Sequence, residues 1–192
     1  VRWRKSFGTA RTEELAALYK SRPDFTFRAS PGLSPEMLTG MDASRLELPA
    51  WAGDAVFYRC GQARRLIGGG LLEKGLAYIT DPATTAAPEL ARSAGLEFRR
   101  IYDACSAPGG KSLLLESMFS SALIVSGDRS ARRQAQTRRN FINFNSKNVA
   151  VAADALAPPF KEGSFDLVFV DAPCTGTGTF RRRPDVLWRF SN

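Results

Sequence analysis

Apolar and polar positions follow a regular pattern over the second half of the chain. Four short apolar runs, each followed by an aspartate, are typical of strands, and stretches of helical period separate the first three. The runs are Ile101–Tyr102, Leu123–Gly127, Val149–Ala153 and Phe165–Val170, and the helical stretches are Lys111–Ser120 and Ser130–Asn145. This alternation indicates βαβ winding, so we predict an α/β fold with a mostly parallel sheet.

The first half of the chain is less regular. Thr12–Lys20 has a helical pattern, and beyond it prolines and glycines separate short aromatic and β-branched pieces. We interpret Arg22 to about Ile67 as a small mixed α/β module. The chain is therefore divided into an N-terminal accessory module, residues 1–75, and a second domain, residues 76–192.

The start of the second domain carries its own signals. Leu76–Thr80 has a strand-like composition, and Asp81-Pro82 is a suitable cap and first-turn pair for a helix that runs toward Gly95. Pro88 lies inside that helical stretch, and we predict a kink there.

The strand ends carry the candidate chemistry. In an open parallel sheet, ligands bind beyond the carboxyl ends of the strands, so acids at these ends should converge on one crevice. One such acid alone would most simply cap a helix, whereas four in series indicate a shared site. The four are Asp103, Asp128, Asp154 and Asp171.

The stretch Asp103–Ser112, DACSAPGGKS, predicts a strand that turns into a helix. Its glycines should let a ligand lie against the backbone, and the helix N-terminus favours a carboxylate or phosphate. Asp128 follows the glycine turn at about the 20-residue spacing of a ribose-binding acid, and Asp154 could accept from an adenine amino group. The dinucleotide glycine pattern is absent, and Cys105 stands where a P-loop would have glycine. S-adenosylmethionine, which has an adenosine and a carboxylate but no phosphate, satisfies these conditions.

Composition narrows the function classes. The 192-residue chain has a net charge of +8, with 27 basic residues that are mostly arginine, which favours a nucleic-acid partner. Histidine is absent, which excludes histidine-dependent triads, and the three cysteines have no paired spacing of a zinc site. No apolar run approaches the roughly 18 residues of a membrane span. We therefore expect no metal and no membrane partner, and a cytoplasmic location, with the mitochondrial matrix as the alternative.

A second diagnostic stretch, Asp171–Gly178 or DAPCTGTG, follows the last predicted strand. Together with Asp103–Ser112 and the continuation Thr179–Arg189, it resembles the RNA cytosine-5 methyltransferases of the Sun/RsmB (Nop/Sun) class. Tyr78–Thr84 is similar to that family's lead-in to the catalytic domain, so the resemblance covers about Leu76–Arg189. It implies a Rossmann-like class I methyltransferase fold and S-adenosylmethionine-dependent methylation of cytosine C5 in RNA, with ribosomal RNA as the expected substrate. The accessory module would then take part in RNA recognition.

The resemblance also implies roles for individual residues. Asp128 would hold the cofactor ribose and Asp154 the adenine side, and Asp171 would lie between cofactor and base, near cytosine N3. Asp171 and Cys174 are the expected catalytic residues, and Cys174 is credited with helping to release the product. The residues that would wrap the methionine end of the cofactor are Cys105, Ser106, Ala107, Pro108, Gly109, Gly110 and Lys111.

Cytosine C5 is a poor nucleophile, which explains the need for a thiol. Attack of a thiolate on C6 creates an enamine whose C5 takes the methyl group, and loss of the C5 proton then expels the thiolate. The thiol reaches only an unstacked base, so single-stranded or locally opened RNA is the expected substrate. The run Phe180–Phe190 combines arginines with aromatic residues and is a candidate for RNA contact, whereas the arginines of Ser130–Asn145 are interpreted as a solvated face.

The sequence departs from the family pattern at one point. In the family, the attacking thiol comes from a second cysteine on the following strand, and no cysteine follows Cys174 here. A strand as apolar as Phe165–Val170 should be buried on both faces. We therefore expect a fragment that lacks its C-terminal strands, or a second chain that completes the sheet, and poor turnover of RNA by the 192 residues alone.

Two alternatives remain open. One is a catalytically degenerate relative that keeps the cofactor pocket and acts as an RNA-binding or ribosome-assembly factor. The other is an amino-directed nucleic-acid methyltransferase, which would carry Asp/Asn-Pro-Pro-aromatic at the last strand end. Ala172-Pro173-Cys174 disfavours the second alternative.

Overall fold

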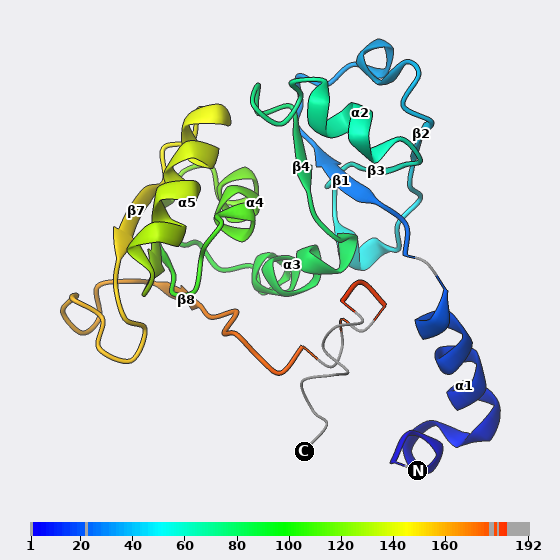
Figure 1. Cartoon of the computed structure of the whole chain (residues 1–192). Helices are drawn as coiled ribbons and strands as arrows, with labels where there is room; N and C mark the ends of the chain where they lie inside the picture. The colour runs from blue at the N-terminus through cyan, green and yellow to red at the C-terminus, as the bar shows by residue number, and fades with distance from the viewer. Residues whose placement is uncertain (1, 22, 177–178, 180, 184–192) are drawn as a thin grey trace. The chain divides into compact units, whose positions relative to one another are not determined.

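The computed structural model describes residues 2–21, 23–176, 179 and 181–183 (Figure 1). The chain divides into two compact units, Phe25–Ala172 and a smaller one made of Val1–Asp24 and Pro173–Asn192. The smaller unit contains helix α1 (Arg2–Lys20), which bends at Gly8, where φ is 76° and ψ is 171°. Because of this bend, the rings of Trp3 and Tyr19 pack together with their centroids 5.3 Å apart. The predicted helix over Thr12–Lys20 is present and begins earlier than expected.

The larger unit begins with an antiparallel sheet of strand order β2-β3-β1-β4. Its core is a cluster of buried apolar side chains that includes Phe27, Leu66 and Ala77. The prolines and glycines separate strands of only three or four residues, as the prediction of a small mixed α/β module implies. The sheet also contains β4, which the sequence had assigned to the second domain. Its elements are β1 (Thr26–Ala29), η1 (Pro35–Leu38), β2 (Ala43–Arg45), η2 (Ala50–Ala52), β3 (Phe57–Cys60), α2 (Ala63–Gly68) and β4 (Ala77–Ile79).

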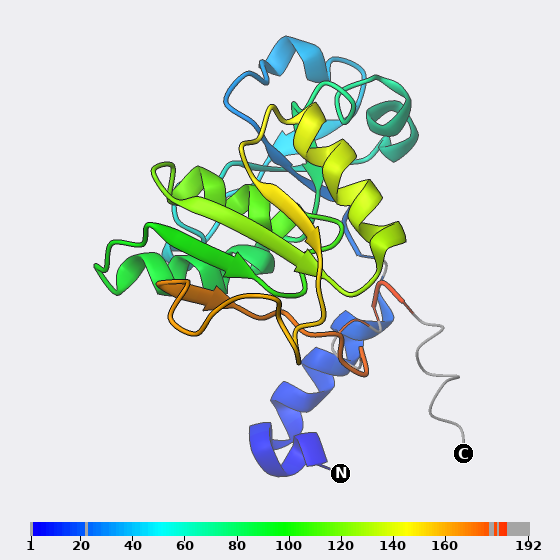
Figure 2. The same cartoon turned by 90° about the vertical axis from the view of Figure 1, so that its left-hand side faces the viewer.

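A second sheet of order β7-β6-β5-β8 follows, and all three of its pairings are parallel (Figure 2). Helix α4 (Gly110–Met118) connects β5 to β6, and α5 (Ala131–Asn143) connects β6 to β7. The prediction of a mostly parallel α/β sheet is confirmed. Its strands are β5 (Arg100–Asp103), β6 (Leu123–Asp128), β7 (Val149–Ala152) and β8 (Leu167–Phe169).

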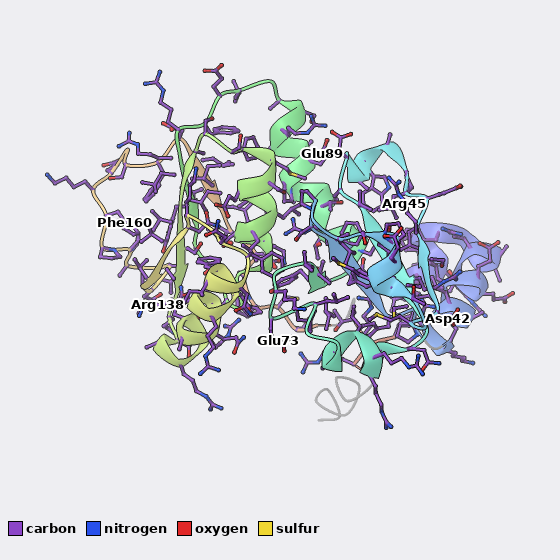
Figure 3. All side chains as sticks on the ribbon, turned by 90° about the horizontal axis from the view of Figure 1, so that it is seen from above. Asp42, Arg45, Glu73, Glu89, Arg138 and Phe160 are labelled. Atoms are coloured by element: carbon purple, nitrogen blue, oxygen red, sulfur yellow. The ribbon has the colours of Figure 1, made fainter. Side chains whose placement is uncertain are left out.

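Between the two sheets lie α3 (Ala86–Ser93) and α4 (Figures 1 and 3). The 3₁₀ turn η3 (Pro82–Thr85) precedes α3, and the Asp81 carboxylate caps it by accepting from the Ala83 N–H at 2.7 Å. The predicted helix that opens at Asp81-Pro82 is therefore present, with η3 as its first turn. η3 continues directly into α3, since Thr85 and Ala86 both have right-handed helical φ and ψ. Pro88 lies in the first turn of α3, where a proline is tolerated, and the kink predicted there is not seen.

Alternate residues of β5 face opposite sides of the parallel sheet. Ile101 is fully buried against Leu115 of α4 and Ile124 of β6. Tyr102 packs against Phe160 and Phe165, with ring centroids 5.0 and 5.1 Å away. Figure 3 shows Phe160 on the side of the sheet away from α4. The central strand is thus enclosed by a helix on one face and by aromatic side chains on the other.

Strand β8 pairs with β5 and stands at the edge of the described sheet, and Val168 and Val170 are 54% and 60% exposed. Leu167 and Phe169 pack on the core from the other face of the strand. Burial on both faces was expected only for a sheet completed by further strands or by a second chain, and no observation supports that second chain.

The turn before β4 sets how closely the antiparallel sheet approaches α5. A Cβ atom on Gly75 would lie 2.1 Å from the Asn143 carbonyl oxygen, whereas one on Gly95 would meet nothing within 4 Å. Both glycines have a φ of +67°. Gly95→Ala should therefore cost about 1–2 kcal/mol of backbone strain alone. Gly75→Ala should cost about 1–3 kcal/mol more, because backbone must move. Urea unfolding of the two variants measures the difference, and equal losses would contradict the close approach.

Candidate functional site

The connection from β5 to α4 forms a tight turn at the carboxyl ends of the parallel strands. The Ser106 N–H donates to the Gly127 carbonyl at 2.8 Å, and the Gly109 N–H donates to the Ser106 carbonyl at 2.6 Å. The first bond ties the turn to β6, and the second closes the turn on itself. Gly109, with a φ of 98°, is the residue immediately before α4.

The two glycines of the turn make room for protein side chains. A Cβ on Gly109 would lie 2.9 Å from the Phe141 ring and 3.0 Å from the Thr137 methyl group, both on α5. A Cβ on Gly110 would lie 2.4 Å from the ring of Tyr78 on β4. The predicted approach of a ligand to the backbone of this turn stays a prediction, since these contacts concern only the Cβ side of each glycine. The glycines allow α5 and β4 to approach the turn.

Two polar side chains of α5 also hold the turn. Arg133 donates from Nη2 to the Ala107 carbonyl at 2.6 Å, and Asn140 donates from Nδ2 to the Pro108 carbonyl at 2.7 Å. Sequence reasoning missed both residues and treated the arginines of this helix as a solvated face. Their seven-residue spacing, which places both on one side of the helix, is the signal that could have found them.

Asp103, at the end of β5, is fully buried. Its Oδ2 accepts from the Ser112 hydroxyl at 2.6 Å, while its Oδ1 has no hydrogen-bond partner among the residues that the structure describes. Burial raises the pKa of Asp103 from its ordinary value of 3.8 to about 6, and Asp171 contributes in the same direction. Lys111 and the Ser112 hydroxyl oppose this rise in pKa.

The other three acids have different surroundings. Asp128 is 4% exposed, and its Oδ2 lies 2.9 Å from Nη1 of Arg133 while its Oδ1 accepts from the Ser130 N–H at 2.9 Å. Asp154 is half-buried and accepts from the Leu156 N–H at 3.0 Å. Asp171 is exposed and forms an ion pair with Lys111, with Nζ and Oδ2 2.5 Å apart.

Cys105 lies where these acids meet. Burial raises the pKa of its thiol, and the negative charges of Asp128, Asp103 and Asp171 raise it further. The structure thus brings three of the four strand-end acids together around the turn, and Asp154 lies near enough to raise the pKa of Tyr102. This thiol stays protonated at neutral pH.

Cys174 belongs to the smaller unit. It is exposed, and its Sγ accepts from the Gly176 N–H at 3.4 Å. Arg181 lies in the same unit and donates from Nε to the Ser21 carbonyl at 3.3 Å. Phe180 and Trp188 of the predicted RNA-contacting run lie outside the described residues.

Elsewhere in the larger unit, a cavity of about 750 Å³ separates the antiparallel sheet from α3 and α4. Residues of both charges line it, including Arg28, Glu89 and Glu116, and none of the predicted site residues does. Within the described ranges, no cluster of histidine, cysteine or acidic side chains could hold a metal ion. No helix in this part of the chain is long and apolar enough to cross a membrane.

Comparison with known proteins identifies the family. The sequence profile described as 16S rRNA methyltransferase RsmB/F matches residues 94–192, about half of the chain. The chain belongs to this family. The class predicted from the two motifs, the Sun/RsmB RNA cytosine-5 methyltransferases, is thereby confirmed.

One curated relative is ribosomal RNA small subunit methyltransferase B of Shewanella oneidensis, 32% identical over 162 residues. The match covers 82% of this chain and 36% of the relative, so the chain spans about a third of the relative's length.

Solved structures support the fold. The crystal structure of PH0851 matches with a TM-score of 0.76 at 21% identity, over 96% of this chain and 43% of that one. A methyltransferase homolog from Pyrococcus horikoshii matches with a TM-score of 0.67 at 24% identity, over 95% of this chain and 61% of that one. The chain has the predicted class I methyltransferase fold, preceded by the small mixed α/β module.

The charges at the turn suit a ligand with both a cation and a carboxylate. Asp103, Asp128 and Asp171 supply negative charge around Cys105, and Lys111 supplies a positive charge at the same turn. The Oδ1 of Asp103 is buried without a hydrogen-bond partner among the described residues, so the charged form of this carboxyl group is unfavourable. An adenosyl methionine sulfonium has this combination of a cation and a carboxylate.

The buried charge of Asp103 leads to a prediction about stability. Its pKa is raised in the folded state, so the stability of the wild type is fully present below about pH 4 and falls as the pH rises through about 6. Asp103→Asn removes the buried charge and keeps an acceptor for Ser112. The variant should exceed the wild type by about 3 kcal/mol in unfolding free energy at pH 8, and the gap should close near pH 4. Chemical denaturation across this range measures it, and a gap independent of pH would contradict the assignment.

Proposed function

We propose that this chain serves the S-adenosylmethionine-dependent methylation of cytosine C5 in RNA, with ribosomal RNA as the substrate. The observation that carries the proposal is the set of acids around the Lys111 turn at the ends of parallel strands, in a chain of the RsmB/F family. The Shewanella relative is named as a ribosomal RNA methyltransferase. Because the chain spans only part of that relative, the activity is proposed from the site and the family together.

The cofactor would bind along the ends of β5, β6 and β7. Asp128 would accept from the ribose, Asp154 from the adenine amino group, and the turn Cys105–Lys111 would enclose the methionine end. The bound cofactor supplies a methyl group made electrophilic by the sulfonium. Arg133 fixes the carboxylate of Asp128 in place, so that the ribose would meet an oriented acceptor.

Asp171 would face the target base. Asp171 follows strand β8, which pairs with β5, and its ion pair with Lys111 holds its exposed carboxylate in place. From there it would contact cytosine near N3, which makes C6 more open to attack by a thiolate. Lys111 thus orients the acid that meets the base.

The cysteines divide by environment. Cys60 is buried and donates to the Met41 carbonyl, and the Cys105 thiol has a raised pKa, so neither suits attack on a base. Cys174 is exposed in the stretch that matches the family's Asp-Ala-Pro-Cys motif. We assign to it the release step, in which the C5 proton is lost and the C6–S bond to the thiolate of the family's second cysteine breaks.

RNA is the proposed partner because of charge as well as family. The net charge is +8, and Arg182 and Arg183 are exposed just beyond the Cys174 motif. The accessory module, residues 1–75, is proposed to help recognise RNA, and the cytoplasm is the proposed location, with the mitochondrial matrix as the alternative. No observation favours the catalytically degenerate alternative.

Cofactor binding is the first test. Calorimetric titration with S-adenosylmethionine should show one site, and Asp128→Ala should weaken binding at least about tenfold, because a charged acceptor is lost. Asp166→Ala is the matched control, since that carboxylate accepts from the Arg99 and Arg100 N–H groups at the opposite end of β5. It should leave the affinity unchanged. Equal effects of the two substitutions would show that Asp128 acts only through stability.

The position of the methyl group is the second test. Ribosomal RNA that lacks its methylcytosines is incubated with methyl-tritiated S-adenosylmethionine and then digested to nucleosides. Any tritiated methyl group that the chain transfers to the RNA should be found on C5 of cytosine, whatever the rate of transfer. Label on an exocyclic amine would favour an amino-directed enzyme instead and would contradict the proposed C5 transfer.

A further inference from the structure

Gln134 is a polar residue at a buried position, where side-chain packing alone would favour an apolar residue. It lies on the buried face of α5 with Thr137 and Phe141, and it is 2% exposed. Burial of an amide is unfavourable unless its hydrogen bonds are made. The contacts of this side chain therefore indicate what it does.

The Gln134 amide nitrogen reaches three different segments. Nε2 lies 2.8 Å from the Ser126 carbonyl on β6, 2.8 Å from the Val151 carbonyl on β7, and 3.3 Å from the Ser106 hydroxyl in the turn. The two carbonyls take the two amide hydrogens at short distance. Because carbonyls only accept, the nitrogen must be the atom that faces them, which fixes the orientation of the amide.

Each of these segments carries groups that the proposed function assigns to the cofactor. Ser126 stands two residues before Asp128, Val151 three before Asp154, and Ser106 is part of the turn itself. The Gln134 Oε1 is buried without a hydrogen-bond partner among the described residues. An apolar side chain would avoid that unpaired oxygen but would connect none of the three segments.

We propose that Gln134 is a positioning residue for the cofactor site. Its two amide hydrogens hold the ends of β6 and β7 at a fixed spacing, and the Ser106 hydroxyl of the turn lies 3.3 Å from the same nitrogen, so that Asp128, Asp154 and the turn are arranged before the ligand arrives. The inference rests on the proposed function, since it concerns the same pocket. Gln134 itself is buried behind the site and acts through the segments that it joins.

The test compares three variants. Gln134→Met keeps the length of the side chain and removes both donors, and it should weaken S-adenosylmethionine binding about tenfold at every pH. Gln134→Glu replaces the donors by a group whose protonation can be changed. Ala135→Glu is the control, because it adds the same carboxylate at an exposed position on the same helix turn and should bind as the wild type does.

The glutamate variant separates positioning from loss of stability. When the new glutamate carboxyl group is protonated, it can donate one hydrogen bond to a backbone carbonyl. When it is ionised, it has only acceptors, and these face the Ser126 and Val151 carbonyls, which also only accept. Its affinity relative to the wild type should therefore fall as the pH rises from 5.5 to 8.5, measured by calorimetry at 15 °C on protein shown to be folded by near-ultraviolet circular dichroism. A residue that only fills space would give a ratio independent of pH.

The outcomes distinguish the inference from the function on which it rests. If the wild type does not bind S-adenosylmethionine, both are overturned. If the wild type binds and both Gln134 variants bind equally well at every pH, only the inference is overturned. Should Gln134→Met fail to fold, Gln134→Glu at pH 5.5 and 8.5 decides: a ratio to wild type that changes with pH supports positioning, and a constant ratio overturns it.

Discussion

The close contact between α5 and the glycine turn is the constraint on which the site depends. Gly109 lies so near Thr137 and Phe141 that a single added carbon would overlap them. At that separation Arg133 and Asn140 reach the carbonyls of Ala107 and Pro108. Packing and hydrogen bonding thus fix the same turn from the same helix. The turn thus depends on α5, which follows the next strand, as well as on its own glycine and its internal hydrogen bond.

Electrostatics at the site works against the stability of the unliganded fold. Asp103 is buried with one oxygen unpaired, and the acids around Cys105 repel one another. Such an arrangement is unfavourable for a fold alone, and carboxyl groups with perturbed pKa values of this kind cluster at functional sites. Lys111 offsets part of the negative charge through Asp171, and Arg133 offsets another part through Asp128.

The sequence alone predicted the elements that depend on local pattern. The four parallel strands, both connecting helices and the acid at each strand end follow from periodicity and from residues adjacent in the chain. The contacts of α5 with the turn could not be predicted in this way, because Arg133 and Asn140 resemble surface residues until the helix is docked. The kink predicted at Pro88 was wrong, because the effect of a proline on a helix depends on its position relative to the start of the α-helix.

Tyr78 of the antiparallel sheet lies against Gly110, the first residue of α4, and α4 itself lies between the two sheets. The Tyr78 side chain is thus a direct contact between the antiparallel sheet and the turn. A hinge motion between the sheets would have to separate Tyr78 from Gly110 and expose the aromatic ring. A displacement of the antiparallel sheet would therefore also move the turn that precedes α4.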